Sequence, residues 1–261
     1  MDLKEQNWQN FITHHVRNWQ GIWTRYSPQG EIIESFKSLR SFRTNPEQTE
    51  LFQTNCYTYD HGKVEEKKWH SYKLDKVFSD GIMHPAFPAM RSYFLKQGAA
   101  VWSRKILEPG SNFQPAEFFF RYEEIRYSVG IVYNTDGSLM KVGSIREDAV
   151  NSPSKYWSQE INLLSERNFS RDWQGTSITI TPDLRTSKPI QTQLNWPVIE
   201  NNKMFFFPDG TSLSCPTQVT LGTPFTIVAN WLVNNSYLQQ LSVKYNHNGV
   251  FLGLTLELLH R

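Results

Sequence analysis

The sequence predicts a mainly β protein in which one small antiparallel architecture is used twice, and three observations predict it. Arg-Asn-Trp-Gln-Gly at residues 17–21 returns as Arg-Asp-Trp-Gln-Gly at residues 171–175, an offset of 171 − 17 = 154. A second echo closes each half, with Tyr-Asn-Thr-Asp-Gly at 133–137 and Tyr-Asn-His-Asn-Gly at 245–249. Between these motifs, strand-like segments alternate with turn residues, which is typical of an antiparallel barrel or sandwich.

A helix is expected before the first copy of the motif. The apolar face of this helix, with the i, i+3, i+4, i+7 spacing, is formed by Trp8, Phe11, Ile12, His15, Val16 and Trp19. Asp2, with Glu5 three residues later, predicts where the helix begins. We expect the apolar face to pack on a sheet or to close the end of a barrel.

The strands expected in the first half are residues 22–26, 31–43, 51–59, 63–72, 98–106, 117–133 and 139–147. Residues 117–133 are long for one strand, so we expect a bulge or bend within them. Asp136 and Gly137 predict a hairpin turn into the last strand of this half.

The second half is expected to begin near residues 148–154, which divides the chain into domains 1–150 and 151–261. Ser152 and Pro153 suit the start of a second helix. Its apolar face would begin with Trp157, Ile161 and Leu164. The strands expected after it are residues 176–181, 189–196, 203–207, 211–219, 225–233, 238–245 and 250–259.

Composition limits the classes of function. The chain has nine Trp and 17 Phe, enough to fill two cores or to line a cavity with aromatic rings. The net charge is +2 with both signs interspersed, which argues against a nucleic-acid partner. Cys56 and Cys215 are too few for a disulfide framework and lack a catalytic signature, so we expect reduced thiols in a cytoplasmic protein. No signal peptide or membrane span is expected.

The helix followed by Trp-x-Gly and an antiparallel meander resembles the calycin, or lipocalin-like, pattern. In that pattern the Trp closes the barrel floor and the Gly lets the first strand pass close by. Residues 17–30 are similar to the opening of a mainly cyanobacterial family with two lipocalin-like domains, and the similarity extends through 127–134 and 144–147. In the second half it is carried by residues 171–175 and 245–249.

This resemblance implies two lipocalin-like antiparallel β-barrels in tandem, each preceded by an amphipathic helix, that bind a small apolar molecule. Related barrels include the bilin-attaching lyases of phycobiliprotein assembly, and some double lipocalin-like proteins act as cyclases in natural-product pathways. The resemblance supplies no catalytic residues. Arg17 and Arg171 recur beside the repeated Trp, where we expect each to stack on the indole.

Candidate catalytic residues lie in two segments of the first half. In the aromatic and charged segment 117–126, Glu124 and Glu117 are candidate general acids or bases. His84, in the Pro-, Met- and aromatic-rich loop 79–90, is a candidate proton carrier. The residues expected to contact a ligand are Arg126, Arg121, Phe118, Phe120, Tyr122, Trp102, Met83 and Phe87. An ion pair that seals the barrel and an ordinary covering loop are the structural alternatives.

Two classes of function stay open. In the first, the first barrel binds a hydrophobic, aromatic small molecule, and shape with one acid–base group makes the protein a cofactor-free cyclase, isomerase or decarboxylase of specialised metabolism. In the second, the protein is a non-catalytic carrier, or a bilin-lyase-like or chaperone-like protein that acts on a partner. The sequence contains no metal-site or cofactor motif, and it leaves open a homodimer or a pigment-protein partner.

Overall fold

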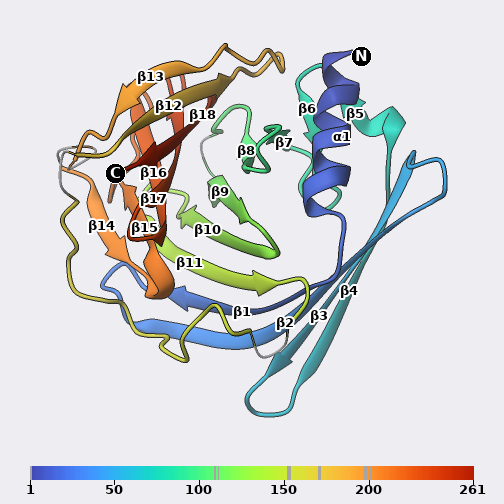
Figure 1. The fold of residues 1–261 in the computed structure, drawn as a ribbon, viewed down its shortest axis with the longest axis horizontal. Coiled ribbons are helices and arrows are strands. Elements are labelled where there is room, and N and C mark those ends of the chain that lie inside the picture. Colours follow the sequence, from blue (N-terminus) through green and yellow to red (C-terminus); the bar gives the residue numbers. More distant parts are fainter. Residues whose placement is uncertain are drawn as a thin grey trace.

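The computed structural model describes residues 2–108, 110, 112–151, 154–169, 172–196, 199 and 201–261, with the backbone alone for 70–74. The chain is mainly β, with two large antiparallel sheets and one α-helix in the described residues (Figure 1). Helix α1 (Leu3–His15) begins where expected, and the Asp2 N–H donates to the Glu5 carboxylate at 3.4 Å. No helix in the described part of the chain has the length and apolar character needed to cross a membrane.

The first sheet contains eleven strands in the order β4-β3-β2-β1-β11-β10-β9-β8-β7-β6-β5. Their bounds are β1 (Trp19–Tyr26), β2 (Ile32–Thr44), β3 (Glu50–Tyr59), β4 (Val64–Lys73), β5 (Val77–Phe78), β6 (Gly81–Met83), β7 (Met90–Phe94), β8 (Ala100–Arg104), β9 (Phe113–Tyr122), β10 (Ile125–Tyr133) and β11 (Leu139–Asp148).

The first sheet must curl, because its two edge strands are neighbours in sequence. The three-residue 3₁₀ turn η1 (Leu74–Lys76) alone joins β4 to β5, and such a link spans at most about 14 Å. Eleven flat strands would separate the edges by roughly 48 Å. The sheet is therefore barrel-like, and α1 lies against β5, β6 and β7 (Figure 1).

The second sheet contains seven strands in the order β13-β12-β18-β17-β16-β15-β14. Their bounds are β12 (Gln174–Ile180), β13 (Ile190–Gln193), β14 (Lys203–Phe206), β15 (Thr211–Cys215), β16 (Phe225–Asn234), β17 (Tyr237–Tyr245) and β18 (Phe251–His260), with the 3₁₀ turn η2 (Pro208–Gly210) before β15. In each sheet the strand that begins within the Trp-Gln-Gly motif pairs with the last strand of that half of the chain, β1 with β11 and β12 with β18.

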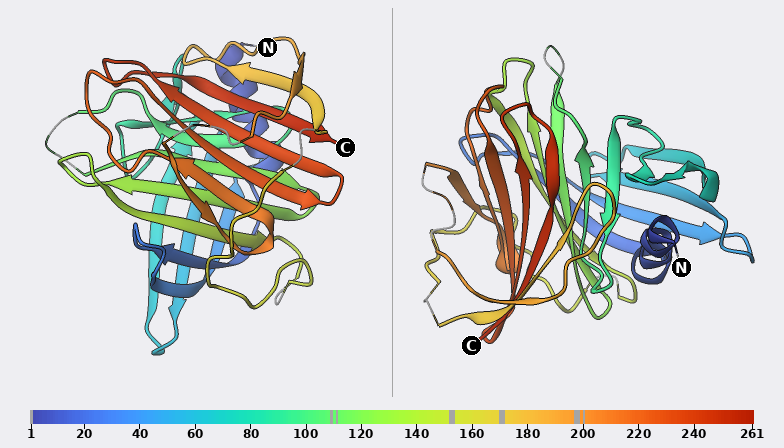
Figure 2. Two further views of the ribbon diagram at one scale, coloured as in Figure 1. Left: turned by 90° about the vertical axis from the view of Figure 1, so that its left-hand side faces the viewer. Right: turned by 90° about the horizontal axis from the view of Figure 1, so that it is seen from above.

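The two sheets share one hydrophobic core. Phe120 of β9 meets Trp231 of β16 with ring centroids 6.2 Å apart, and Tyr93 of β7 stacks on Phe251 of β18 at 4.8 Å. The second sheet therefore packs on one side of the first, and α1 lies on the other side (Figure 2). A ligand cavity in the first sheet can only open on the side of α1.

The helix predicted from residue 152 onward is wrong for the described residues 154–169, which contain no helix. Ser152 and Pro153 lie outside the described residues. The segment instead runs along the strands: the Tyr26 hydroxyl donates to the Ile161 carbonyl at 2.6 Å, and the Leu164 N–H donates to the Phe206 carbonyl at 2.7 Å. Backbone groups that a helix would pair internally are therefore used by the neighbouring strands.

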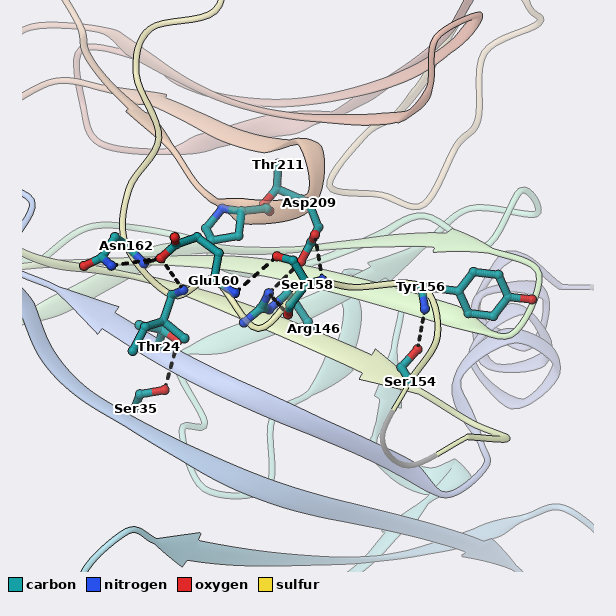
Figure 3. Close-up of polar contacts among 12 residues, drawn as sticks. Thr24, Ser35, Arg146, Ser154, Tyr156, Ser158, Glu160, Asn162, Asp209 and Thr211 are labelled. Atoms are coloured by element: carbon teal, nitrogen blue, oxygen red, sulfur yellow. Dashed lines mark hydrogen bonds and ion pairs between the residues drawn. The ribbon is translucent and has the colours of Figure 1, made fainter.

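A partly buried ion pair joins this connecting segment to both sheets. Arg146 of β11 donates to the Asp209 carboxylate at 2.5 Å and to the Ser158 carbonyl at 3.1 Å (Figure 3). Asp209 also accepts the Ser158 N–H at 3.0 Å. The first sheet, the segment and the loop before β15 are thus joined by three hydrogen bonds.

The segment 117–133, expected as one bent strand, is a hairpin. Strand β9 ends at Tyr122, Glu123 has a positive φ of 49°, and β10 begins at Ile125. Tyr122 pairs directly with Ile125, so the turn contains only two residues. This turn decides which side chains of the segment face the same way.

Candidate functional site

A cavity of about 530 Å³ lies on the α1 side of the first sheet. Strands β1–β4 and β7–β11 contribute most of its lining, and α1 contributes Phe11 and His15. The lining includes the aromatic side chains of Phe11, Trp23, Phe42, Tyr57, Trp69, Phe87, Phe94, Trp102, Phe113 and Phe119. Gly130 and Gly143 face each other across β10 and β11 on this lining, and their missing side chains leave part of the space.

One end of the cavity holds three buried charged groups. Arg40 of β2 donates two hydrogen bonds to the Glu147 carboxylate of β11, from Nε at 2.5 Å and from Nη2 at 2.6 Å. Arg126 of β10 donates to the same carboxylate from Nε at 2.7 Å. Although burial opposes the charged form of Glu147, Arg126 and Arg40 hold the pKa of this carboxyl below its ordinary value.

The two guanidinium groups respond differently to this environment. Burial favours the neutral form of Arg40, but Glu147 outweighs it and raises the pKa of Arg40. Burial together with the neighbouring Arg40 lowers the pKa of Arg126 to about 10 despite Glu147. Both groups remain cationic at neutral pH, and the Nη2 of Arg126 has no hydrogen-bond partner in the described residues.

His15 closes this end from α1. Its Nε2 lies 2.9 Å from the Gly98 carbonyl and its Nδ1 lies 3.4 Å from Nη1 of Arg126. Burial, with Arg126 and Arg121, holds the pKa of His15 well below its ordinary value. The neutral ring therefore donates from Nε2 and accepts from Arg126 at Nδ1.

The indole ring of the repeated Trp in the first half lies against three guanidinium groups. The guanidinium carbons of Arg126, Arg121 and Arg17 lie 4.3, 4.9 and 5.7 Å from the ring centre of Trp19. The expected stacking of Arg17 is confirmed, whereas Arg171 lies outside the described residues. In the second sheet, Arg261 lies 5.0 Å from the ring centre of Trp173.

Glu117 of β9 lies further along the cavity. Its Oε2 accepts from Nε2 of Gln114 at 3.3 Å, and its enclosed Oε1 has no hydrogen-bond partner in the described residues. Desolvation raises the pKa of Glu117, and Glu147 adds to this while Arg40 opposes it. Such a carboxyl is suited to hold a proton and transfer it to a bound molecule.

The second sheet has the same framework but leucines in place of these charges. The glycine of each Trp-Gln-Gly pairs with Glu147 in the first sheet and with Leu259 in the second. On the adjacent strand, Arg126 pairs with Glu147, and Leu238 pairs with Leu259. Both pairs of positions are separated by 112 residues (259 − 147 and 238 − 126), as are Tyr133 and Tyr245 of the hairpin echo.

Three further positions show the same contrast. Arg40 and Leu194 each lie opposite the repeated Trp. His15 and Phe169 each precede that Trp by four residues. Arg121 pairs with Arg126 of β10, and Leu232 pairs with Leu238 of β17. Leu194, Leu238 and Leu259 form an apolar cluster with Trp173, against which Phe169 and Leu232 pack. The second sheet therefore fills the equivalent positions with apolar side chains in place of the buried charges.

Five of the residues predicted from the sequence line the cavity: Glu117, His84, Arg126, Trp102 and Phe87. Phe118 and Phe120 instead belong to the core between the sheets, and Tyr122 contacts Trp231 and Tyr237 beyond it. Glu124 forms an ion pair with Arg17, and Arg121 donates to the Ile125 carbonyl at 2.9 Å. Neither of these two residues lines the cavity, and Met83 of β6 does not line it either.

His84 is held as a structural group of its loop. Its Nδ1 accepts the N–H groups of Ala86 and Phe87, each at 3.1 Å, and its ring meets Trp102 edge-on at 4.6 Å. Burial lowers its pKa to about 4. At neutral pH His84 is therefore uncharged, with one ring nitrogen already used.

Sequence reasoning missed Arg40, Glu147 and His15 as site residues. Glu147 could have been found by extending the 112-residue offset of the hairpin echo, because this offset aligns Glu147 with Leu259, as it aligns the predicted Arg126 with Leu238. Cys56 and Cys215 are free, and burial raises the pKa of the Cys215 thiol to about 12. Within the described residues, no three His, Cys, Asp or Glu side chains are grouped to hold a metal ion.

Two family models match parts of the chain. Residues 4–152 match the N-terminal domain of the DUF3598 family, a domain of unknown function, and residues 197–260 match the C-terminal domain of biogenesis factor required for ATP synthase 1. No curated protein matches the sequence.

Two solved structures resemble the fold. A DUF3598-family protein of unknown function from Nostoc punctiforme is 19% identical, with a TM-score of 0.68 and coverage of 98% of both chains. The S-type phycobiliprotein lyase CPES from Guillardia theta is 11% identical, with a TM-score of 0.36 over 57% of this chain and 96% of its own. The first of these likenesses extends the fold to a cyanobacterial protein.

Proposed function

Because the chain belongs to the DUF3598 family, whose description carries no activity, we propose its function from the site alone: the cavity of the first sheet binds a hydrophobic, aromatic small molecule. In this proposal residues 1–150 are the ligand-binding part of the chain and residues 151–261 support it. The observation that carries the proposal is the aromatic lining of a cavity of about 530 Å³.

This volume and lining fall within the range of small-molecule sites, which supports the proposal. Ligand pockets commonly enclose about 300–1,000 Å³, and apolar or aromatic walls with a few polar groups line them. Here Trp23, Phe119 and Trp102 supply flat walls, while Arg126 and Glu117 supply polar groups. A planar ligand would stack on the walls and direct its polar groups at these two side chains.

Glu117 gives the site a means of catalysis without a cofactor. Burial raises the pKa of Glu117, and a carboxyl with a raised pKa can donate a proton to a bound double bond or carbonyl and take one back, as cyclisation and isomerisation require. The same cavity without that transfer is a carrier. Binding is common to both versions, so binding is the property to test first.

Fluorescence titration with N-phenyl-1-naphthylamine, an uncharged aromatic probe, tests this proposal. We expect saturable binding with one probe per chain. Trp23→Ala should weaken it roughly tenfold, because about 1.4 kcal/mol of stacking is lost. Trp196→Ala is the matched control, since Trp196 is also half-buried but packs beside Trp173 in the second sheet. Absence of saturable binding, or equal weakening by both variants, would overturn the proposal.

A further inference from the structure

We propose that the ligand of this cavity carries one carboxylate group, which binds to Arg126 at the charged end. This inference rests on the proposed function, and it names the chemical class of the ligand as an aromatic monocarboxylic acid. Its basis is the imbalance of the buried charges around Glu147.

The charges at this end do not cancel. Arg40 and Arg126 contribute two positive charges and Glu147 one negative charge, and all three side chains are buried. Glu117, the other carboxyl that interacts with these groups, makes no hydrogen bond to either guanidinium, and burial raises its pKa and so favours its neutral form. The bidentate contact of Arg40 already satisfies both carboxylate oxygens of Glu147. Arg126 is therefore the surplus cation, and a buried charge without full compensation is costly.

Arg126 also has an unused donor. Its Nε is taken by Glu147 and its Nη1 by His15, whereas its enclosed Nη2 has no hydrogen-bond partner in the described residues. The aromatic rings of Trp19 and Phe119 flank the guanidinium, with ring centres at 4.3 and 5.5 Å. The guanidinium is thus held in place, and Arg126 lines the cavity while one of its donor nitrogens has no partner in the described residues.

A carboxylate matches both properties. It brings one negative charge, which brings the sum to zero, and it accepts the short, charge-assisted hydrogen bonds that a guanidinium donates. A phosphate monoester brings about −1.5 to −2 charges and would leave an excess of negative charge in the enclosed site. A neutral ligand would leave the surplus cation as it is.

The second sheet indicates that these charges do not serve the fold. Its equivalent of Arg126 is Leu238, and its equivalent of Glu147 is Leu259, in a cluster closed by apolar packing. Buried ion pairs are often no more stabilising than apolar residues of similar size. The charges of Arg126 and Glu147 occur in the first sheet alone and lie beside the cavity. Recognition of a charged ligand explains this placement.

Calorimetric titration with 2-naphthoate and its uncharged isostere 2-naphthamide tests the inference. In the wild-type protein we expect 2-naphthoate to bind at least tenfold more tightly. Arg126→Leu leaves the balanced pair of Arg40 and Glu147 and should abolish this preference, while 2-naphthamide binding stays within about twofold and reports that the variant is folded. Arg126→Lys, which keeps the charge, should retain part of the preference.

Arg121→Leu is the matched control, because Arg121 also faces Trp19 but does not line the cavity. It should keep the preference for 2-naphthoate. Equal affinities of the two probes for the wild-type protein, or a preference that survives Arg126→Leu, would overturn the inference and leave the proposed function standing. Failure of both probes and of N-phenyl-1-naphthylamine to bind would overturn the proposed function itself.

Discussion

Glu147 occupies in the first sheet the position that Leu259 occupies in the second. Each pairs across its sheet with the glycine of a Trp-Gln-Gly motif, and each is fully buried beside the Trp of that motif. The same arrangement of strands therefore accommodates a carboxylate bound by two guanidinium groups in the first sheet. At the equivalent position of the second sheet it accommodates an apolar side chain packed among leucines. The two sheets are an internal comparison of charged and apolar closure.

The first prediction copies the second sheet into the first. The triple variant Arg40→Leu, Arg126→Leu, Glu147→Leu should fold and be as stable as the wild-type protein or more stable by about 1–4 kcal/mol, because all three buried charges and the cost of their desolvation are removed together. Glu147→Leu alone should lose about 3–5 kcal/mol, since it leaves two buried guanidinium groups unpaired. Urea unfolding measures both, and a triple variant less stable than the single variant would contradict this account.

Local patterns predicted the elements that depend on nearby residues. The N-terminal helix, the hairpin at Asp136 and Gly137 and the mainly β class are confirmed, although the helix ends at His15 and Trp19, the last residue of the expected helical face, begins β1. Each depends on side-chain periodicity or on turn residues with a preferred conformation. The helix expected around Trp157 failed because neighbouring strands pair with the backbone of that segment, which the sequence of the segment does not record.

The site was only partly predictable because the hairpin at Glu123 reverses the side-chain pattern. Alternation along one continuous strand places Arg126 on the face of Phe118 and Phe120. The two-residue turn pairs Arg126 with Arg121, so Arg126 shares the face of Glu117 and enters the cavity. A turn of one residue more or fewer would invert this assignment.

The second prediction concerns the repeated glycine. A Cβ on Gly175 would lie 1.8 Å from the Leu258 carbonyl oxygen, and one on Gly21 would lie 2.5 Å from that of Arg146. Both approaches involve backbone atoms that cannot move without breaking the strand pairing. Gly21→Ala should therefore cost about 1–3 kcal/mol and Gly175→Ala more.

Thermal and urea unfolding measure these losses against Gly143→Ala. Gly143 is also a strand glycine, but its Cβ would meet nothing closer than 3.6 Å. This control should be close to wild type in stability. A Gly175→Ala variant no less stable than Gly143→Ala would show that the glycine is not required for the close approach of β12 to β18.

The third prediction is a pH dependence set by Glu117. Desolvation raises the pKa of this carboxyl in the folded protein, so the folded state holds the proton more tightly than the unfolded state does. In the unfolded state a glutamate carboxyl has a pKa of about 4.3. The stability that protonation of Glu117 adds to the folded state is fully present below the pKa of the unfolded state. This stability is lost as the pH rises through the raised pKa of the folded state. Glu117→Gln, which stays neutral, should therefore gain stability relative to the wild-type protein as the pH rises from about 4 to 8.

Urea unfolding of the wild-type protein, Glu117→Gln and the control Glu31→Gln at several pH values between 4 and 8 measures this difference. Glu147 titrates in all three proteins, so its contribution cancels when they are compared. The exposed Glu31 controls for the loss of a negative charge at the surface. If the stability difference between Glu117→Gln and the wild-type protein does not change with pH, or changes equally in Glu31→Gln, then Glu117 is ionised in the folded protein across this range and cannot be the proton donor of the cavity.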